Sequence, residues 1–158
     1  VGYCQSENLP AWFSDCFKKK ELNKKFNLAS FLSPIYLKED FNGDKIQDIA
    51  VLITEKATKK KGILLIHGKS YEHFIFGAGQ TFGNSGNDFK WADKWILYKK
   101  KTVFETLFDK ESGDIIGEKE ITLQRPGILI ENHEDGAALS GGIIYWNNNK
   151  YIWIHQGE

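Results

Sequence analysis

The sequence of 158 residues has one arginine, two cysteines, no methionine and no excess of charge of either sign. Proteins favour arginine for bidentate contacts with phosphates and base edges, yet here Arg125 is alone. Acidic and basic residues balance at 21 each, so no strong field attracts nucleic acid or an anionic membrane. No apolar run approaches the roughly 20 residues that a membrane-spanning helix needs. We therefore expect no nucleic-acid partner and no membrane span.

The lack of methionine extends to position 1, which is Val1. Removal of a signal peptide would leave such a start, so we expect an exported protein that is periplasmic, surface-bound or secreted. Cys4 and Cys16 lie close together near the start, and in an oxidising compartment they would form a disulfide. Two unrelated reduced thiols are the alternative.

Length and composition predict one domain with a buried core over residues 1–158. Residues 1–33 are expected to be helical or irregular, with a broken helical stripe of apolar residues between 11 and 26. After Pro34, apolar runs of four to eight residues alternate with turn-forming clusters, which predicts a β-rich core over residues 34–158. The fold class is therefore mainly β (α+β), with short helical segments near the N-terminus.

Short links between the apolar runs favour antiparallel pairing in a single sheet or barrel-like arrangement. Residues 49–53 and 63–66 are nearly all apolar and should form central strands, whereas 102–108 mixes faces and should lie nearer an edge. Glycine-rich residues 77–88 are expected to form a long surface loop, which is a secondary candidate surface. The expected strands are residues 35–39, 49–55, 62–67, 71–76, 94–98, 102–108, 118–123, 127–131, 142–146 and 150–155.

Residues 40–48, Asp-Phe-Asn-Gly-Asp-Lys-Ile-Gln-Asp, place oxygen-bearing side chains at the first, third, fifth and ninth positions before an apolar strand. Calcium takes six to eight oxygen ligands, and such a loop supplies several of them. The pattern resembles the calcium loops of the FG-GAP family, found in integrin-type propellers and in many exported bacterial proteins. The resemblance implies a Ca²⁺ site with these ligands: Asp40, Asn42, Asp44, the Ile46 carbonyl and Asp48.

The loop departs from the FG-GAP pattern in two ways. Lys45 stands where that family has glycine, and the motif occurs once, which implies a local site and not a propeller. An EF-hand is excluded because Val51 occupies the place of its bidentate glutamate. The alternative to a metal site is a hairpin turn at Asn42-Gly43, with the aspartates as polar turn residues.

The C-terminal hairpin carries aromatic residues on both arms around an asparagine triplet at residues 147–149. Such residues can bind a sugar or protein surface, and they can also simply pack across the strands. The candidate binding surface consists of Tyr145, Trp146, Tyr151 and Trp153.

Hydrolase motifs are absent: the sequence has no Gly-x-Ser-x-Gly elbow and no His-Glu-x-x-His. We assign no catalytic residue, although Asp93, Glu105 and Glu131 would favour an enzyme if they met beside His133 in a pocket. Residues 140–145 are faintly similar to the Ser-Gly-x-x-Tyr loop of periplasmic lysozyme inhibitors, with the tyrosine one residue too far along.

The chain as a whole resembles small exported bacterial proteins of unknown function that share the Asp-Phe-Asn-Gly-Asp loop and a Gly-Gly-Ile-Ile-Tyr-Trp hairpin. We expect an exported, non-catalytic binding module whose partner is an unidentified protein or glycan. The alternatives are an envelope hydrolase that acts on glycan or peptide, and a protein similar to the lysozyme inhibitors.

Overall fold

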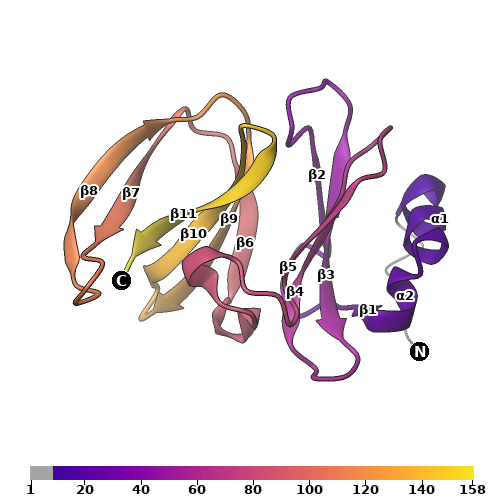
Figure 1. Ribbon diagram of the computed structural model, residues 1–158, viewed down its shortest axis with the longest axis horizontal. Coiled ribbons are helices and arrows are strands. Elements are labelled where there is room, and N and C mark those ends of the chain that lie inside the picture. The colour runs from indigo at the N-terminus through magenta and orange to yellow at the C-terminus, as the bar shows by residue number, and fades with distance from the viewer. Residues whose placement is uncertain (1–8) are drawn as a thin grey trace.

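A computed structural model describes residues 9–158, which form four layers (Figure 1). From right to left in the figure, these are two short helices, a five-stranded sheet, a four-stranded sheet and an outer hairpin. All strand pairs in the three sheets are antiparallel. The prediction of a mainly β protein with antiparallel strands and short helices near the N-terminus is confirmed.

The helices are α1 (Ala11–Lys19) and α2 (Leu22–Lys25). Sheet A contains β1 (Phe26–Leu28), β2 (Tyr36–Glu39), β3 (Asp48–Glu55), β4 (Lys61–Ile66) and β5 (His73–Gly77). Sheet B contains β6 (Lys94–Tyr98), β9 (Gly127–Glu134), β10 (Ala137–Asn147) and β11 (Lys150–Gly157). The outer hairpin is β7 (Thr102–Phe108) with β8 (Ile115–Thr122), and two 3-10 turns, η2 (Gly83–Ser85) and η3 (Phe89–Trp91), lie between β5 and β6. No helix within residues 9–158 has the length and hydropathy of a membrane-crossing segment.

Each expected strand has a counterpart among β2 to β11, but the strands divide among three sheets where one sheet or barrel was expected. Strand β1 is a correction, because its residues were assigned to the helical or irregular N-terminal part. Helix α1 ends at Lys19, Glu21 takes a left-handed φ of 58°, and Phe26 then pairs with Glu55 on β3. Three residues are too few to show the alternation of apolar and polar side chains that marks a strand. The segment is a strand because it pairs with the free edge of β3.

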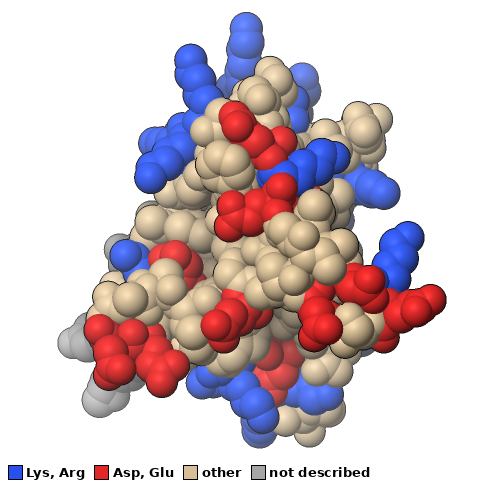
Figure 2. All heavy atoms as spheres, turned by 90° about the vertical axis from the view of Figure 1, so that its left-hand side faces the viewer, with Lys and Arg blue, Asp and Glu red and all other residues tan. Residues whose placement is uncertain are grey.

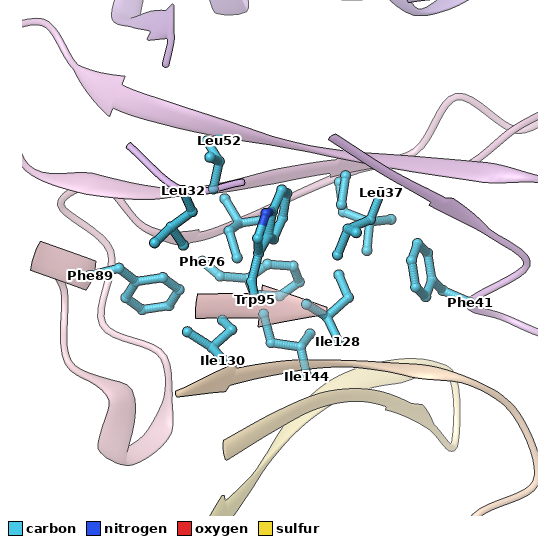
Figure 3. Close-up of a cluster of buried hydrophobic side chains, with 13 residues drawn as sticks. Leu32, Leu37, Phe41, Leu52, Phe76, Phe89, Trp95, Ile128, Ile130 and Ile144 are labelled. Carbon is cyan, nitrogen blue, oxygen red and sulfur yellow. The ribbon is translucent and has the colours of Figure 1, made fainter. Parts of the chain in front are cut away.

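The main core fills the space between sheets A and B. Trp95, which is fully buried, lies in the middle of this cluster, and its indole Nε1 donates a hydrogen bond to the Pro34 carbonyl at 2.7 Å (Figure 3). The opposite face of sheet A is covered by α1 through Phe13 and Cys16. Strands β3 and β4 are therefore covered on both faces, which confirms the prediction that they are central.

The outer hairpin covers the other face of sheet B through a smaller cluster that includes Val103 and Tyr145. Its outward side exposes Phe104, Ile115 and Ile116, each at least half accessible to solvent. Figure 2 shows this side of the molecule, with lysine side chains at its upper end and acidic side chains across its middle and lower parts.

Cys16 lies buried on α1, with its Sγ 3.8 Å from the Tyr71 carbonyl. Burial raises the pKa of the Cys16 thiol. Cys4 lies outside the described residues, so the disulfide between Cys4 and Cys16 remains a prediction.

Candidate functional site

The acidic loop, residues 40–48, connects β2 to β3 at the upper end of sheet A in Figure 1. Its carboxylates face the loop's own backbone. Asp40 Oδ1 accepts from the N–H of Gly43 at 2.8 Å, and Asp40 Oδ2 accepts from the N–H of Lys45 at 2.7 Å. Asp44 Oδ1 accepts from the N–H of Ile46 at 2.9 Å. Backbone dipoles therefore offset part of the repulsion between the carboxylates of this loop.

Asp48 is the loop's one fully buried carboxylate. Its two oxygens accept hydrogen bonds from the N–H groups of Phe41 and Gly68, both at 2.9 Å. Burial raises the pKa of this carboxyl to about 6, in spite of the two backbone donors, and the nearby charges of Asp44 and Asp40 raise it further. Asp48 thus ties the acidic loop to the turn that follows β4.

Lys45 takes a φ of 68°, in the left-handed region. Lys45 occupies the position at which the FG-GAP pattern has glycine, and it takes a left-handed conformation that favours glycine. We expect Lys45→Gly to stabilise the protein by about 0.5–1 kcal/mol, because the Cβ penalty in this region exceeds the entropy that glycine costs. Urea unfolding measures the change. Lys45→Ala is the control: it removes the charge and keeps the Cβ, so equal stability of the two variants would contradict this account.

Within residues 9–158, no group of three or more Asp, Glu, His or Cys side chains is arranged to hold a metal ion. Calcium binding by the predicted ligands stays a prediction. These ligands are Asp40, Asn42, Asp44, the Ile46 carbonyl and Asp48.

Melting temperature tests the calcium prediction. A weak extracellular-type site, with a dissociation constant of about 10⁻⁴ to 10⁻³ M, would stabilise the protein by about 1.4 kcal/mol at ten times that concentration. The shift should appear in wild type with millimolar Ca²⁺ and vanish in Asp44→Ala. If wild type does not shift, or if both proteins shift equally, the loop is only a turn.

A hydrogen-bonded path connects the acidic loop to β11. The Asn42 carbonyl oxygen accepts from the Asp44 N–H at 3.4 Å, so the Asn42 Nδ2 group faces His67 Nδ1 at 3.3 Å and donates to it. The proton of a neutral His67 then sits on Nε2, which donates to the Tyr151 hydroxyl oxygen at 2.6 Å. Burial lowers the pKa of His67 and raises that of Tyr151, so both stay neutral near pH 7.

A groove with aromatic walls runs along β11, and we call it the β11 groove. It consists of three adjoining hollows of about 410, 440 and 200 Å³. The first two share Phe82 and Tyr151, and the last two share Trp153, so the hollows adjoin one another. The aromatic residues that line the groove are Phe74, Phe76, Phe82, Trp91, Tyr151 and Trp153.

The structure separates the four aromatic residues of the predicted binding surface. Tyr151 and Trp153 line the β11 groove. Trp146 is half-buried against His67 and Tyr151, with ring centroids 5.0 and 4.7 Å away. Tyr145 is buried on the opposite face of sheet B, and its hydroxyl accepts from the Gln124 N–H at 2.7 Å. Tyr145 is therefore a packing residue, because successive side chains of a strand point to opposite faces.

Sequence reasoning included Phe82 in the secondary candidate surface of residues 77–88 but did not connect it with the last hairpin, and it missed Trp91. Both residues lie between β5 and β6, and no periodic pattern marks them as partners of β11. Gly142 was also missed. A Cβ at this position would lie 2.3 Å from the Trp153 indole, so the lack of a side chain lets the indole lie against β10.

Arg125 lies against Gly43 and donates from Nη1 to the Trp146 carbonyl at 2.8 Å.

Asp93, Glu131 and His133 do meet, at the edge of sheet B. Asp93 accepts from both the backbone N–H and the Nδ1 of His133, each at 2.7 Å, and these bonds lower the pKa of Asp93. Glu131 Oε1 lies 3.7 Å from His133 Nε2. The three residues lie outside the hollows of the β11 groove, and Glu105 lines that groove instead of joining them.

The chain was compared with models of protein families, with curated proteins and with solved structures, and none of the three comparisons gave a match.

Proposed function

We propose that this chain is an exported, non-catalytic binding protein whose ligand lies in the β11 groove. The observation that carries the proposal is the row of three adjoining hollows along one strand, with partly exposed aromatic side chains in each. Binding sites are typically concave and mostly apolar, with a few polar groups that fix orientation. Aromatic side chains provide large contact areas and lose little conformational entropy on binding.

The polar residues of the groove suit recognition better than catalysis. Gln80, Asn84 and Asn149 offer neutral amide donors and acceptors beside the aromatic rings. His155 Nδ1 accepts from the Trp153 indole Nε1 at 3.0 Å, which fixes that ring in the groove wall. The cluster at His133, the strongest grouping of titratable side chains for a hydrolase, is outside the groove. A binding role is therefore favoured over the hydrolase alternative.

Tryptophan fluorescence tests the proposal, because Trp91 and Trp153 line the groove. The protein would be titrated with two panels, soluble envelope oligosaccharides and a peptide library, and each mixture would be examined for products by mass spectrometry. We expect saturable binding to a member of one panel without turnover. Phe82→Ala, in the groove wall, should weaken binding at least tenfold, since central aromatic residues dominate binding energy.

Phe104→Ala is the matched control, because Phe104 is exposed on the outer hairpin and lines none of the three hollows. Its affinity should equal that of wild type. Turnover that a single carboxylate change abolishes would replace the proposal with the hydrolase alternative. Binding that Phe82→Ala leaves intact would place the ligand elsewhere.

A further inference from the structure

Strand β5 ends sheet A, and its free edge faces the first hollow of the β11 groove. Four consecutive residues of β5, 73–76, line this hollow, which we call the slot. Consecutive side chains point to opposite faces of a sheet, so a hollow that touches all four lies along the strand's edge. Asn149, Lys150 and Tyr151 of the last hairpin form the opposite wall.

The backbone of β5 offers unpaired hydrogen-bonding groups to the slot. The Ala78 N–H donates to the Lys61 carbonyl at 2.9 Å, and the register pairs Phe76 with Ile63 two residues earlier. Hydrogen-bonded pairs alternate along an antiparallel ladder, so Phe74 and Phe76 bond toward β4. The N–H and C=O groups of His73 and Ile75 therefore point away from β4. A turn occupies this edge only at Gly77, which bridges to Gln80.

Hollows lie on both faces of sheet A beside this edge. On the side of sheet B, the slot has an aromatic floor in which the Tyr151 ring lies 4.8 Å from Phe74 and 5.4 Å from Phe76. On the helix side, a hollow of about 260 Å³ is lined by Trp12, Tyr71 and neighbouring residues of α1. Its Lys20 reaches the first residue of β5, with Nζ 3.2 Å from His73 Nδ1. The slot follows β5, whereas the helix-side hollow lies near the His73 end of the strand, so an added strand would place side chains in the slot and, at that end, in the helix-side hollow.

The charged side chains that line the two hollows are mostly positive. Lys150 lines the slot, whereas burial and the charge of Lys20 lower the pKa of His73. No acidic residue within 9–158 lines the slot, although Glu72 directly precedes β5. Lys19 and Lys20 line the helix-side hollow together with a single acid, Asp15. An extended chain with acidic side chains complements this arrangement. A neutral glycan lacks the regular alternation of N–H and C=O groups that matches the edge of a strand.

We infer that the ligand is an extended acidic polypeptide segment that adds to β5 as a further strand of sheet A. The inference rests on the proposed function, because it names the class of ligand for the same groove. Main-chain hydrogen bonds to His73 and Ile75 hold the segment, and side chains in the two hollows select it. The acidic residues lie toward Lys150 and Lys20.

The test uses a capped octapeptide made of two Val-Glu-Glu-Val repeats as the probe, which places glutamate and valine on both faces of an extended strand. Binding and amide exchange are followed by NMR on the whole chain. We expect saturable binding, with slowed exchange of the His73 and Ile75 amides. A probe that is N-methylated at every residue lacks the strand donors on both of its edges and should not bind. A probe with lysine in place of glutamate should bind at least fivefold more weakly.

Two variants test the edge and its charge. Ile75→Pro removes one outward N–H at a position where an edge strand tolerates proline, and it should abolish binding. If Ile75→Pro fails to fold, the N-methylated probe decides the same question. Lys150→Glu should weaken the glutamate probe about fivefold, while Lys110→Glu, the same change at an exposed site on the outer hairpin, should have no effect.

Several outcomes would overturn the inference. No binding of the probe at millimolar concentration, or binding without protection of the two β5 amides, would exclude strand addition. If an oligosaccharide binds to wild type and loses affinity for the Phe82→Ala variant, the proposed function holds but the ligand is a glycan and not a peptide. Protection of the β5 amides that grows with protein concentration, without any probe, would identify a second copy of the chain as the occupant.

Discussion

Replacing Asp48 by asparagine should change the pH dependence of folding more than any other single change in the loop. The folded pKa of about 6 exceeds the unfolded value near 3.9, so folding favours the protonated carboxyl. The stability that Asp48 contributes is therefore complete below pH 4 and is lost as the pH rises through 6. Two pKa units correspond to about 3 kcal/mol.

The asparagine variant has no such titration, but an unfavourable contact of its amide lowers its free energy of unfolding by about 2 kcal/mol at every pH. One of its two side-chain positions becomes an N–H donor, which faces the backbone donor of Phe41 or Gly68. Wild type should therefore be more stable by about 2 kcal/mol at pH 4. The difference should fall by about 3 kcal/mol by pH 7, where the asparagine variant becomes the more stable protein by about 1 kcal/mol. Urea unfolding of both proteins at half-unit pH steps measures the difference.

His67 makes the comparison with a variant necessary. Burial lowers its folded pKa below the usual 6.5, so its contribution to stability is present at high pH and is lost as the pH falls below that range. This effect opposes that of Asp48 in the same pH window and flattens the wild-type curve. It cancels in the difference between the two proteins. Asp114→Asn, at an exposed position, should change stability by less than about 0.5 kcal/mol at each pH. A difference for Asp48→Asn that is constant from pH 4 to 7 would contradict the raised pKa.

Gly142→Ala should destabilise the protein by about 2 kcal/mol and displace Trp153 from the wall of the β11 groove. The added Cβ would lie 2.3 Å from the indole atoms Cε2 and Cζ2, which is far inside van der Waals contact. Overpacking of this kind costs about 1–3 kcal/mol, because rings and backbone must shift. Chemical denaturation measures the loss, and near-ultraviolet circular dichroism reports the changed indole environment.

A double-mutant cycle separates this contact from a general weakening of β10. Phenylalanine at position 153 lacks the part of the indole that lies closest to Gly142. The combined variant Gly142→Ala, Trp153→Phe should therefore be more stable than the sum of the single changes implies, by about 1–2 kcal/mol. Additive effects would show that Gly142 is needed for some reason other than the position of Trp153.

Local pattern was enough to predict most of the strands and the hairpins of this protein. Apolar runs bounded by Gly, Asn and Asp clusters place β2 to β11 within a few residues, because alternation and turn chemistry are properties of neighbouring residues. The unbroken apolar runs of β3 and β4 also predicted their central position. A strand that is packed on both faces of its sheet has apolar side chains on both faces, so no polar residue interrupts the run. The acidic loop was singled out for its spacing of oxygen-bearing residues.

Tertiary structure decided what these segments do together. Three residues carry no period of their own, so β1 exists because the edge of β3 is free to pair with it. Asp48 and Tyr145 read from the sequence as a ligand and a surface residue, but both are buried, since a strand's register and the sheet packed against it fix which face each side chain takes. The groove joins Phe82, Trp91 and Trp153 from segments far apart along the chain, because the edges of two sheets meet there. Contacts between distant segments leave no local pattern in the sequence, so the candidate site could be recognised only in the folded structure.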